Sequence, residues 1–521
     1  MATLSILYAT AEAAPLVKVG GLADVAMALP PALTELGLQC DLALPLYRTI
    51  RKQGREIEPV ENVSPFELYG AKADFYRMRI AETGTDCWLI DTDDGLYDVP
   101  HPYTDEAGKA LPRTMERFLF FQRALLHLLV HLKSSGRARY DIIHANDHQT
   151  ALLPTYLRET SYGTALGQPR SVLTIHNLGY QGIYPEEPGR YFTPAEVERH
   201  TGLPARLYYP TGPLEYYGHL NCLKAGLLAA DAITTVSPTY AREITEHPEM
   251  AFGLYDVLRA VRPKLVGLLN GIDTTVWNPR SDEHLSALGG ATYSVSQMAG
   301  KIACKRALFQ TVGFPPSRLA RPLLGCITRL VPQKGADLLA KALPSLVAQD
   351  AYVVILGSGP ERAKLEEAAK PWKGRVKLEL GYNEPLSHLI TAGSDFILMP
   401  SLYEPCGLNQ LYGLAYGTPP IVRRTGGLAD TVRDATAEPE TGTGYSFGPY
   451  DADAFLGACT RALLAYGSRD YRKLRYRAMS VDHDWTKAAE PYRDLYRALN
   501  RGEALPSPRR DGNGSAEELV G

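Results

Sequence analysis

Basic side chains stand beside glycine-rich stretches at two places in this sequence. Lys18 precedes a glycine pair, Gly20 and Gly21, whereas Arg329 and Lys334 follow a predicted strand in the second half of the chain. Glycine lets a ligand reach bare backbone N–H groups, and the dipole of a helix N-terminus attracts phosphate. The three cations therefore predict a site for a phosphate or diphosphate that needs no metal ion. A solvated surface charge is the alternative reading of each cation taken alone.

The pentapeptide GGLAD occurs twice, at residues 20–24 and 426–430. Each copy follows a predicted strand and opens a predicted helix, which is a position where backbone N–H groups bind anions. One copy in each half of the chain predicts a ligand held between two domains. Two ordinary strand-to-helix turns are the alternative.

An acid, a thiol and an imidazole also lie at predicted strand ends. Glu404 precedes Pro405, which disfavours helical backbone before it, so we expect the next helix to begin near Gly407. Cys406 has neither a paired base nor a second cysteine nearby in sequence, which favours a pocket-lining thiol over a nucleophile. His176 ends a strand and precedes further glycines, which favours a role in the site over a structural one.

An acidic run at residues 91–94, DTDD, has the spacing of a metal-binding DxD motif. It follows a predicted strand, and no further ligand stands near it in sequence. We therefore interpret it as a solvated acidic turn and predict no metal site.

Short β-rich runs alternate with helical stretches, which is typical of parallel α/β units. The strands predicted for the first half are residues 5–9, 40–44, 87–91, 141–144, 171–175, 232–236 and 265–269. Those predicted for the second half are residues 323–327, 352–356, 376–380, 396–400 and 419–423. Apolar residues at helical spacing predict a long helix over 113–133. We expect two Rossmann-like sheets, with the candidate side chains at the carboxyl ends of their strands, where such sheets bind ligands.

Composition excludes several classes of protein. The 521 residues are 22% charged with a net charge of −3, so nothing in the balance indicates a nucleic-acid partner or an anionic membrane. Seven cysteines without a CxxC pair are typical of reduced thiols. No apolar run approaches the ~18 residues of a membrane span. The first residues lack a basic segment and predict a strand instead of a signal peptide, so we expect a cytoplasmic protein.

Changes in composition divide the chain into five parts. We predict an N-terminal Rossmann-like domain over 1–264, an interdomain connection over 265–294 and a C-terminal Rossmann-like domain over 295–480. A helix over 481–500 is expected to return to the first domain. Residues 501–521 are rich in Pro, Gly, Ser and charge and predict a disordered tail.

Five motifs, in order along nearly the whole chain, resemble the bacterial glycogen synthase and plant starch synthase family. They read KVGGLADV, HNLGYQG, NGID, TRLVPQKG and SLYEPCGLNQLYGLAYGTPPIVRRTGGLADTV. The resemblance implies the α/β GT-B fold, with two Rossmann-like domains facing each other across a deep interdomain cleft. The N-terminal domain would be the acceptor-side, starch synthase catalytic domain, and the C-terminal domain would bind the nucleotide sugar. It also implies a retaining glucosyltransferase that moves glucose from ADP-glucose to the non-reducing end of an α-1,4-glucan, elongating glycogen without a cofactor or metal.

The resemblance assigns roles to individual residues. The catalytic residues would be Glu404, His176, Lys334 and Arg329. Contacts with the donor would come from Lys18, Gly20, Gly21, Arg329, Lys334, Tyr382, Cys406, Gly407 and Leu408, with Tyr382 packing on adenine. The acceptor or sugar pocket would contain Asp24, Asp147, Asn177 and Asn270. His148 stands where the family often has Trp, which puts acceptor stacking by that ring in question.

Other functions stay open at this point. A related GT-B enzyme could make a small product such as maltose 1-phosphate, or prefer UDP-glucose. A glucan phosphorylase shares the two-domain plan but needs a lysine-bound pyridoxal phosphate, and an inactive glucan-binding homologue would show no turnover. The retained cations and Glu404 favour an active transferase. The sequence does not predict the oligomeric state.

Overall fold

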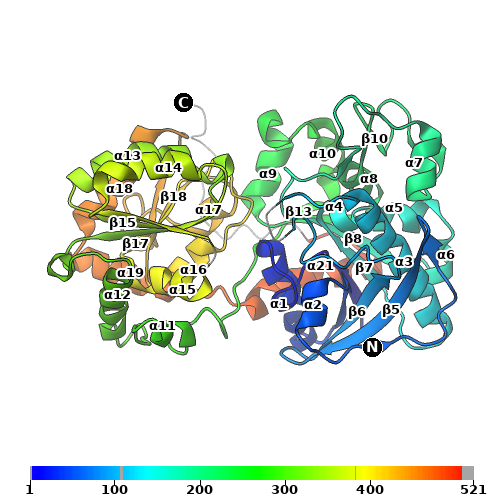
Figure 1. Cartoon of the computed structure of the whole chain (residues 1–521), viewed down its shortest axis with the longest axis horizontal. Coiled ribbons are helices and arrows are strands. Elements are labelled where there is room, and N and C mark those ends of the chain that lie inside the picture. Colours follow the sequence, from blue (N-terminus) through cyan, green and yellow to red (C-terminus); the bar gives the residue numbers. More distant parts are fainter. Residues whose placement is uncertain (1–2, 106–108, 382, 507–521) are drawn as a thin grey trace.

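The computed structural model describes residues 3–105, 109–381 and 383–506, which form two α/β domains lying side by side (Figure 1). Each domain is built around its own mainly parallel sheet, and all twelve predicted strands are present, with ends that match or are shifted by one or two residues. The expected pair of Rossmann-like sheets is therefore confirmed.

The N-terminal domain contains a ten-stranded sheet in the order β13-β12-β8-β7-β1-β2-β6-β5-β3, with β4 paired to β5. The strands from β13 to β6 run parallel, and β5 is antiparallel to β6. Their bounds are β1 Ser5–Ala9, β2 Gln39–Pro45, β3 Glu58–Pro59, β4 Glu67–Leu68, β5 Ala71–Ile80, β6 Thr85–Thr92, β7 Ile142–Asn146, β8 Arg170–Ile175, β12 Ala232–Thr235 and β13 Leu265–Gly267. The parallel strands are almost wholly buried because helices cover both faces of the sheet.

Helices and a small three-stranded sheet complete this domain. The helices are α1 Gly21–Glu35, α2 Arg48–Lys52, α3 Thr114–Ser134, α4 Asp147–Thr150, α5 Leu152–Glu159, α6 Tyr162–Leu166, α7 Pro194–Thr201, α8 Cys222–Ala229, α9 Pro238–Glu246 and α10 Tyr255–Val261. The small sheet contains β9 Ile183–Tyr184, β10 Glu215–Tyr216 and β11 His219–Asn221. The helix predicted over 113–133 is α3, and its apolar stripe is buried in the core.

The C-terminal domain contains a six-stranded parallel sheet in the order β16-β15-β14-β17-β18-β19. Its strands are β14 Leu323–Ile327, β15 Tyr352–Gly357, β16 Val376–Leu380, β17 Phe396–Met399, β18 Pro420–Arg423 and β19 Tyr445–Phe447. Its helices are α11 Glu283–Ala287, α12 Ala299–Thr311, α13 Ala336–Ala348, α14 Arg362–Ala369, α15 Glu384–Gly393, α16 Asn409–Ala415, α17 Gly426–Thr431, α18 Ala452–Ala465 and α19 Arg469–Met479. Separate apolar clusters fill the space on its two faces.

The chain crosses between the domains twice, and the two crossings touch. Ile272 donates its backbone N–H to the carbonyl of His483 at 2.8 Å, beside a parallel bridge to Asp484. The final helices, α20 Trp485–Ala488 and α21 Glu490–Arg501, then pack into the core of the N-terminal domain. There the Tyr496 hydroxyl lies 2.6 Å from Nδ1 of His144.

Two predicted boundaries need correction. Strand β13 pairs with β12, so the N-terminal sheet extends past residue 264. Residues following it are not a free connection, because Leu285 and Tyr293 are buried in the apolar cluster of the C-terminal domain. Polar and glycine-rich composition suggested a linker, but scattered apolar anchors fix the segment to the second domain. The predicted tail falls mostly at 507–521, outside the described residues.

Candidate active site

The predicted N-terminal site residues lie at the carboxyl ends of three neighbouring strands. Lys18 and the glycine pair follow β1, Asp147 follows β7, and His176 follows β8. These strands are adjacent in the order β8-β7-β1, so their loops emerge at one edge of the sheet. The sheet topology thus groups residues that lie up to 158 positions apart, from Lys18 to His176.

The C-terminal site residues follow the same rule. Arg329 and Lys334 come after β14, and Glu404 comes after β17, the strand beside it. The second glycine pair follows β18, the next strand along. Tyr382 falls outside the described residues, so its predicted packing on adenine stays a prediction.

The two sets of loops meet where the domains touch. A Cβ atom built on Gly21 would lie 3.4 Å from Cδ1 of Leu408, and one on Gly179 would lie 3.1 Å from the hydroxyl of Tyr403. The Ser237 hydroxyl donates to the Pro405 carbonyl at 2.7 Å. The segment 403–408 is therefore in contact with the N-terminal domain along its length.

Lys334 and Glu404 form a half-buried ion pair at the centre of this region. Lys334 Nζ lies 2.7 Å from both carboxylate oxygens of Glu404, and the Ser401 hydroxyl donates to Oε2 at 2.9 Å. The Glu404 side chain is 6% exposed and that of Lys334 is 18% exposed. Removing one member of such a pair would leave the other charge unpaired in a partly desolvated place.

The loop carrying Lys334 is held by close backbone packing. Residues Pro332–Lys334 form a short 3-10 turn, and Gly335 follows with φ of 72°. A Cβ atom there would lie 2.0 Å from the carbonyl oxygen of Pro400, so only glycine fits. Leu402 also donates its N–H to the carbonyl of Gln333 at 2.8 Å. The β14 and β17 loops are thus packed directly against each other.

Arg329 is exposed and lies beside Tyr403. Burial raises the pKa of the Tyr403 hydroxyl to about 12, and the positive charge of Arg329 opposes that rise. Asn177 hydrogen-bonds the same hydroxyl. Tyr403 therefore connects the cation of the C-terminal domain with the loop after β8 of the N-terminal domain.

The first GGLAD copy is partly occupied by the protein's own acids. Lys18 Nζ pairs with Asp24 at 2.7 Å, and a carboxylate oxygen of Glu12 accepts the N–H groups of Val19 and Gly20 at 2.6 and 3.0 Å. The Gly20 amide is not open to phosphate in this state, and Asp24 lies against Lys18 as its partner. The roles predicted for Lys18, Gly20 and Asp24 toward substrates stay predictions.

The second GGLAD copy packs against other parts of the protein. Gly426 donates its N–H to the carboxylate of Glu243 at 3.1 Å, and Asp430 accepts the N–H of Thr239 at 2.8 Å. A Cβ atom on Gly426 would lie 2.0 Å from the Glu404 carbonyl oxygen. The predicted second anion turn is thus wrong for this state: its glycines allow α17 to support Glu404 and to join the domains.

Hydrogen bonds join half-buried His176 to buried Asp147 and Asn146. Nε2 of His176 lies 2.9 Å from Oδ1 of Asn146, and Asp147 accepts the backbone N–H groups of His176 and Asn177 at 2.7 and 3.4 Å. Burial lowers the pKa of His176 to about 3 and raises that of Asp147 to about 7. The imidazole is therefore neutral at physiological pH, where it can act by hydrogen bonding.

Cys406 and Gly407 lie in the turn between Glu404 and helix α16. Burial raises the pKa of Cys406 to about 12, and a backbone hydrogen bond joins the thiol to Asn270, which supports a pocket-lining thiol. The helix expected near Gly407 begins at Asn409, because Gly407 has φ of 75°. The side-chain amide of Asn409 donates a hydrogen bond to the Ile327 carbonyl at 2.5 Å, which connects the start of α16 to the end of β14.

Two further sequence features are structural. His148 packs edge-on against Phe118 and across Gly182, whose added Cβ would lie 2.8 Å from the ring, so it does not replace an exposed aromatic surface. In the acidic run, Asp91 pairs with Arg51 and Asp94 pairs with Arg113. The predicted solvated acidic turn is confirmed for exposed Asp93 and Asp94 but is wrong for Asp91, which is buried at the end of β6.

Sequence reasoning missed four residues that hold the site together: Glu12, Glu243, Ser401 and Tyr403. Ser401 stands three positions before Glu404, which is a signal that could have been used. Glu12 and Glu243 bind backbone N–H groups that they meet only after folding. No local pattern marks them.

Comparisons with known proteins agree with this geometry. Residues 5–260 match the family model described as starch synthase catalytic domain, and residues 314–479 match glycosyl transferases group 1. Glycogen synthase of Halorhodospira halophila is 41% identical over 95% of this chain and 99% of its own length. The glycogen synthase of Marinobacter nauticus is 41% identical over 95% of this chain and 98% of its own length.

Solved structures point the same way. The catalytic domain of starch synthase IV from Arabidopsis thaliana, bound to ADP and acarbose, aligns with a TM-score of 0.84 and 32% identity over 96% of this chain and all of that one. Sucrose-phosphate synthase from Thermosynechococcus elongatus aligns over the same share of this chain with a TM-score of 0.55 and 19% identity, which supports the fold alone.

Proposed function

The chain belongs to the glycogen and starch synthase family of glycosyltransferases, and from this premise we propose that it elongates an α-1,4-glucan with glucose from ADP-glucose. The observation that carries the proposal is the convergence of Lys334, Arg329 and Glu404 with the loops of Lys18 and His176 where the domains meet. A nucleoside diphosphate sugar has both the negative charge and the sugar hydroxyls that such a set of side chains would bind.

The cations would stabilise the leaving group. As the bond from C1 to the phosphate oxygen breaks, ADP gains negative charge, and Arg329 and Lys334 stand at the carboxyl end of β14 to bind it. Preorganised groups of this kind contribute about 2.7–4 kcal/mol each to the transition state. Lys18 would supply a third positive charge from the opposite domain, and it would leave its ion pair with Asp24 to do so.

Glu404 would act on the sugar and on Lys334 together. Its carboxylate is held by Lys334 and Ser401, so it is oriented before any ligand binds. A negative charge beside C1 stabilises an oxocarbenium-like transition state. We propose front-face attack by the acceptor 4-hydroxyl with retention of configuration, the leaving phosphate helping to take its proton. A double displacement would need a carboxylate nucleophile on the opposite face of the sugar.

His176 would bind a sugar hydroxyl as a neutral group, because the low pKa of its imidazole leaves it uncharged. Asn146 and Asp147 fix its ring and backbone. We further propose that no metal or other cofactor takes part in the transfer and that the enzyme works in the cytoplasm. Among the helices that the structure describes, none is long and apolar enough to cross a membrane.

The fate of the transferred glucose tests this function. ADP-glucose labelled in its glucose is incubated with maltooligosaccharides, and the products are separated by size and digested with an α-1,4-specific hydrolase. We expect the label in chains longer by one or more α-1,4-linked units. Label recovered in a small sugar phosphate would support the maltose 1-phosphate alternative, and label that stays in the donor would indicate a glucan-binding homologue.

A further inference from the structure

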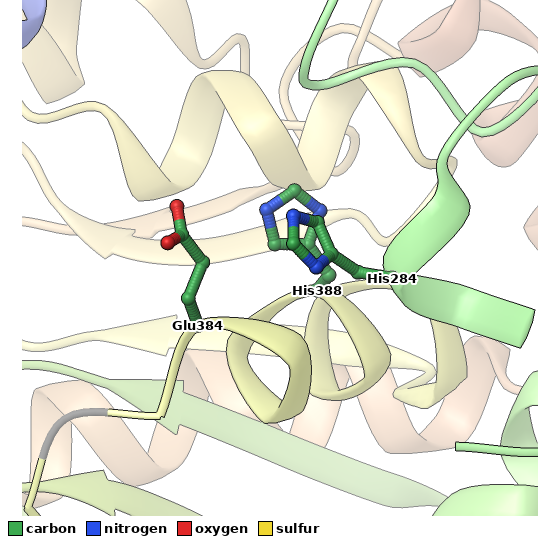
Figure 2. Close-up of side chains that lie close together, drawn as sticks. All are labelled: His284, Glu384 and His388. Carbon is green, nitrogen blue, oxygen red and sulfur yellow. The ribbon is translucent and has the colours of Figure 1, made fainter. Parts of the chain in front are cut away.

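Three potential metal ligands come together on the surface of the C-terminal domain. The ligand atoms of His284, Glu384 and His388 all lie within 4.8 Å of one another. Figure 2 shows Glu384 and His388 on successive turns of α15, with the ring of His284 beside that of His388. We propose that these residues form a binding site for a divalent transition metal ion, with Zn²⁺ the best match.

The buried histidine of the cluster is prepared to act as a ligand. Nδ1 of His388 lies 2.8 Å from Oδ2 of Asp282, so the ring donates its Nδ1 proton to this carboxylate and keeps a lone pair on Nε2. Nε2 is buried without a hydrogen-bond partner, and His388 is 0% exposed. A carboxylate behind a metal-binding imidazole is the usual way in which proteins fix the tautomer. An unpartnered buried nitrogen is costly unless something binds it.

Neighbouring residues hold this arrangement rigid. The ring of Trp277 stacks on His388 at 3.8 Å between centroids, with 12° between their planes. Asp282 also accepts the Tyr416 hydroxyl at 2.6 Å and the backbone N–H of His284 at 2.9 Å.

The helix brings the other ligand to the same side. Glu384 is the first residue of α15, which Asn383 caps, and His388 follows four positions later on the same helical face. His284 comes from α11, whose N-cap is Asp282. Asp282 therefore positions both histidines: it binds the ring of His388 and the backbone N–H of His284.

The set of donors favours zinc. Two imidazole nitrogens and one carboxylate oxygen are a ligand set found in zinc sites with an open fourth position. Tetrahedral bonds of about 2.1 Å place ligand atoms roughly 3.4 Å apart. The present separations need only small rotations of the two half-exposed side chains, Glu384 and His284.

The site lies outside the proposed diphosphate clamp. A bound ion would fasten the segment after the first interdomain crossing to α15. It would also reduce the negative charge that Glu384 directs at Asp24 of the N-terminal domain. The expected effect is thus on the stability and interdomain electrostatics of the chain.

Calorimetric titration with Zn²⁺ tests the site on the full chain after chelation and removal of the chelator. His284→Gln and Glu384→Gln remove half-exposed ligands and leave the buried Asp282–His388 pair intact. His247→Gln is the matched control, because His247 is an exposed surface histidine 3.7 Å from Glu249. Thermal unfolding of each metal-free variant checks that it is folded.

We expect one Zn²⁺ per wild-type chain, a higher Tm with the ion, and visible absorption of tetrahedral Co²⁺ when cobalt replaces zinc. Each ligand variant should weaken Zn²⁺ binding at least about tenfold while the control binds normally. Absent binding by the wild type, equal affinity in the ligand variants, or an equal loss in His247→Gln would each overturn the proposal.

Discussion

Lys334 and Glu404 are the two residues whose pairing most directly links structure and chemistry. Each is placed by a strand end, and the two strands, β14 and β17, are neighbours in the sheet. The pairing gives Glu404 a fixed orientation and limits the charge that Lys334 presents before the donor arrives. Binding of a diphosphate would recruit Lys334 and leave Glu404 facing the sugar.

Glu404→Gln should retain the fold and donor binding but reduce kcat by roughly 10²–10³-fold. Gln keeps the shape and can still accept from Ser401, but it loses the charge that stabilises the transition state and frees Lys334 for the diphosphate. Calorimetric donor affinity and steady-state kinetics measure the two effects. Normal kcat with a large loss of donor affinity would contradict this assignment, and a trapped glucosyl-Glu404 would indicate a nucleophile.

Asp147→Asn should remove a pH dependence of stability. The Asp147 carboxyl titrates near 3.8 in an unfolded chain and at about 7 in the folded protein, so the folded state holds its proton more tightly. The contribution of Asp147 to the free energy of unfolding is fully present below pH 3.8. It falls as the pH rises toward 7 and stays constant above that pH. Asn suits the positive φ of 50° and keeps an acceptor for His176.

The measurement is the Tm of wild type and Asp147→Asn across this pH range. The difference should grow in favour of Asn up to about pH 7 and then stay constant. A difference that does not change with pH would mean that Asp147 has an ordinary pKa.

Sequence could place single residues but not their partners. Arg329, Lys334 and Glu404 were predicted at strand ends because apolar runs precede them. The pairing of Lys334 with Glu404, 70 positions later, depends on strand order, which periodicity does not encode. The zinc ligands His284 and His388 were missed for the same reason, being 104 positions apart with no local spacing pattern.

At the scale of elements, the loops after β14 and β17 pack together and would support the proposed catalytic residues jointly. Their contact depends on Gly335, whose φ of 72° and closeness to Pro400 exclude a side chain. Continuous apolar runs made the parallel strands predictable. β5 was missed because charged residues alternate along it, as expected of an antiparallel strand near a sheet edge. β19 was missed because it is only three residues long.

Gly335→Ala should reduce kcat by about 10²-fold, since a shift of the loop by about 1 Å misplaces Lys334. Gly467→Ala is the control: its φ is 76°, but no atom lies within 4 Å of the added Cβ. The control should lose only about 1–2 kcal/mol of stability from backbone strain and keep normal kinetics. Equal kinetic effects in the two variants would show that strain alone matters.

At the scale of the whole molecule, the two domains are joined by two chain crossings and also touch along residues 403–408. The contact between Ile272 and His483 places both crossings together, which is the arrangement expected of a hinge near Asn270. The return of α21 to the N-terminal domain encloses Tyr492 and Tyr496 in its core. The sequence predicted the helix over 481–500, which contains α21. The surface that α21 covers is set by tertiary packing.

Turnover of the whole enzyme should survive EDTA, because protein cations occupy the places that a metal would take in the diphosphate site. Removing zinc from the His284 cluster should lower Tm without abolishing transfer. The assay is release of nucleoside diphosphate with glycogen as acceptor, with and without chelator. Loss of turnover that Mg²⁺ or Mn²⁺ restores would reject the metal-free clamp.

The identity of the donor tests the central claim most directly. Purified protein is given glycogen and either ADP-glucose or UDP-glucose, and kcat/KM is measured from the release of the corresponding nucleoside diphosphate, with incorporation of glucose into glycogen measured in parallel. The account predicts efficient turnover with ADP-glucose, matched one to one by glucose in the polymer, and much lower kcat/KM with UDP-glucose. A preference for UDP-glucose, or nucleotide release without polymer growth, would contradict it.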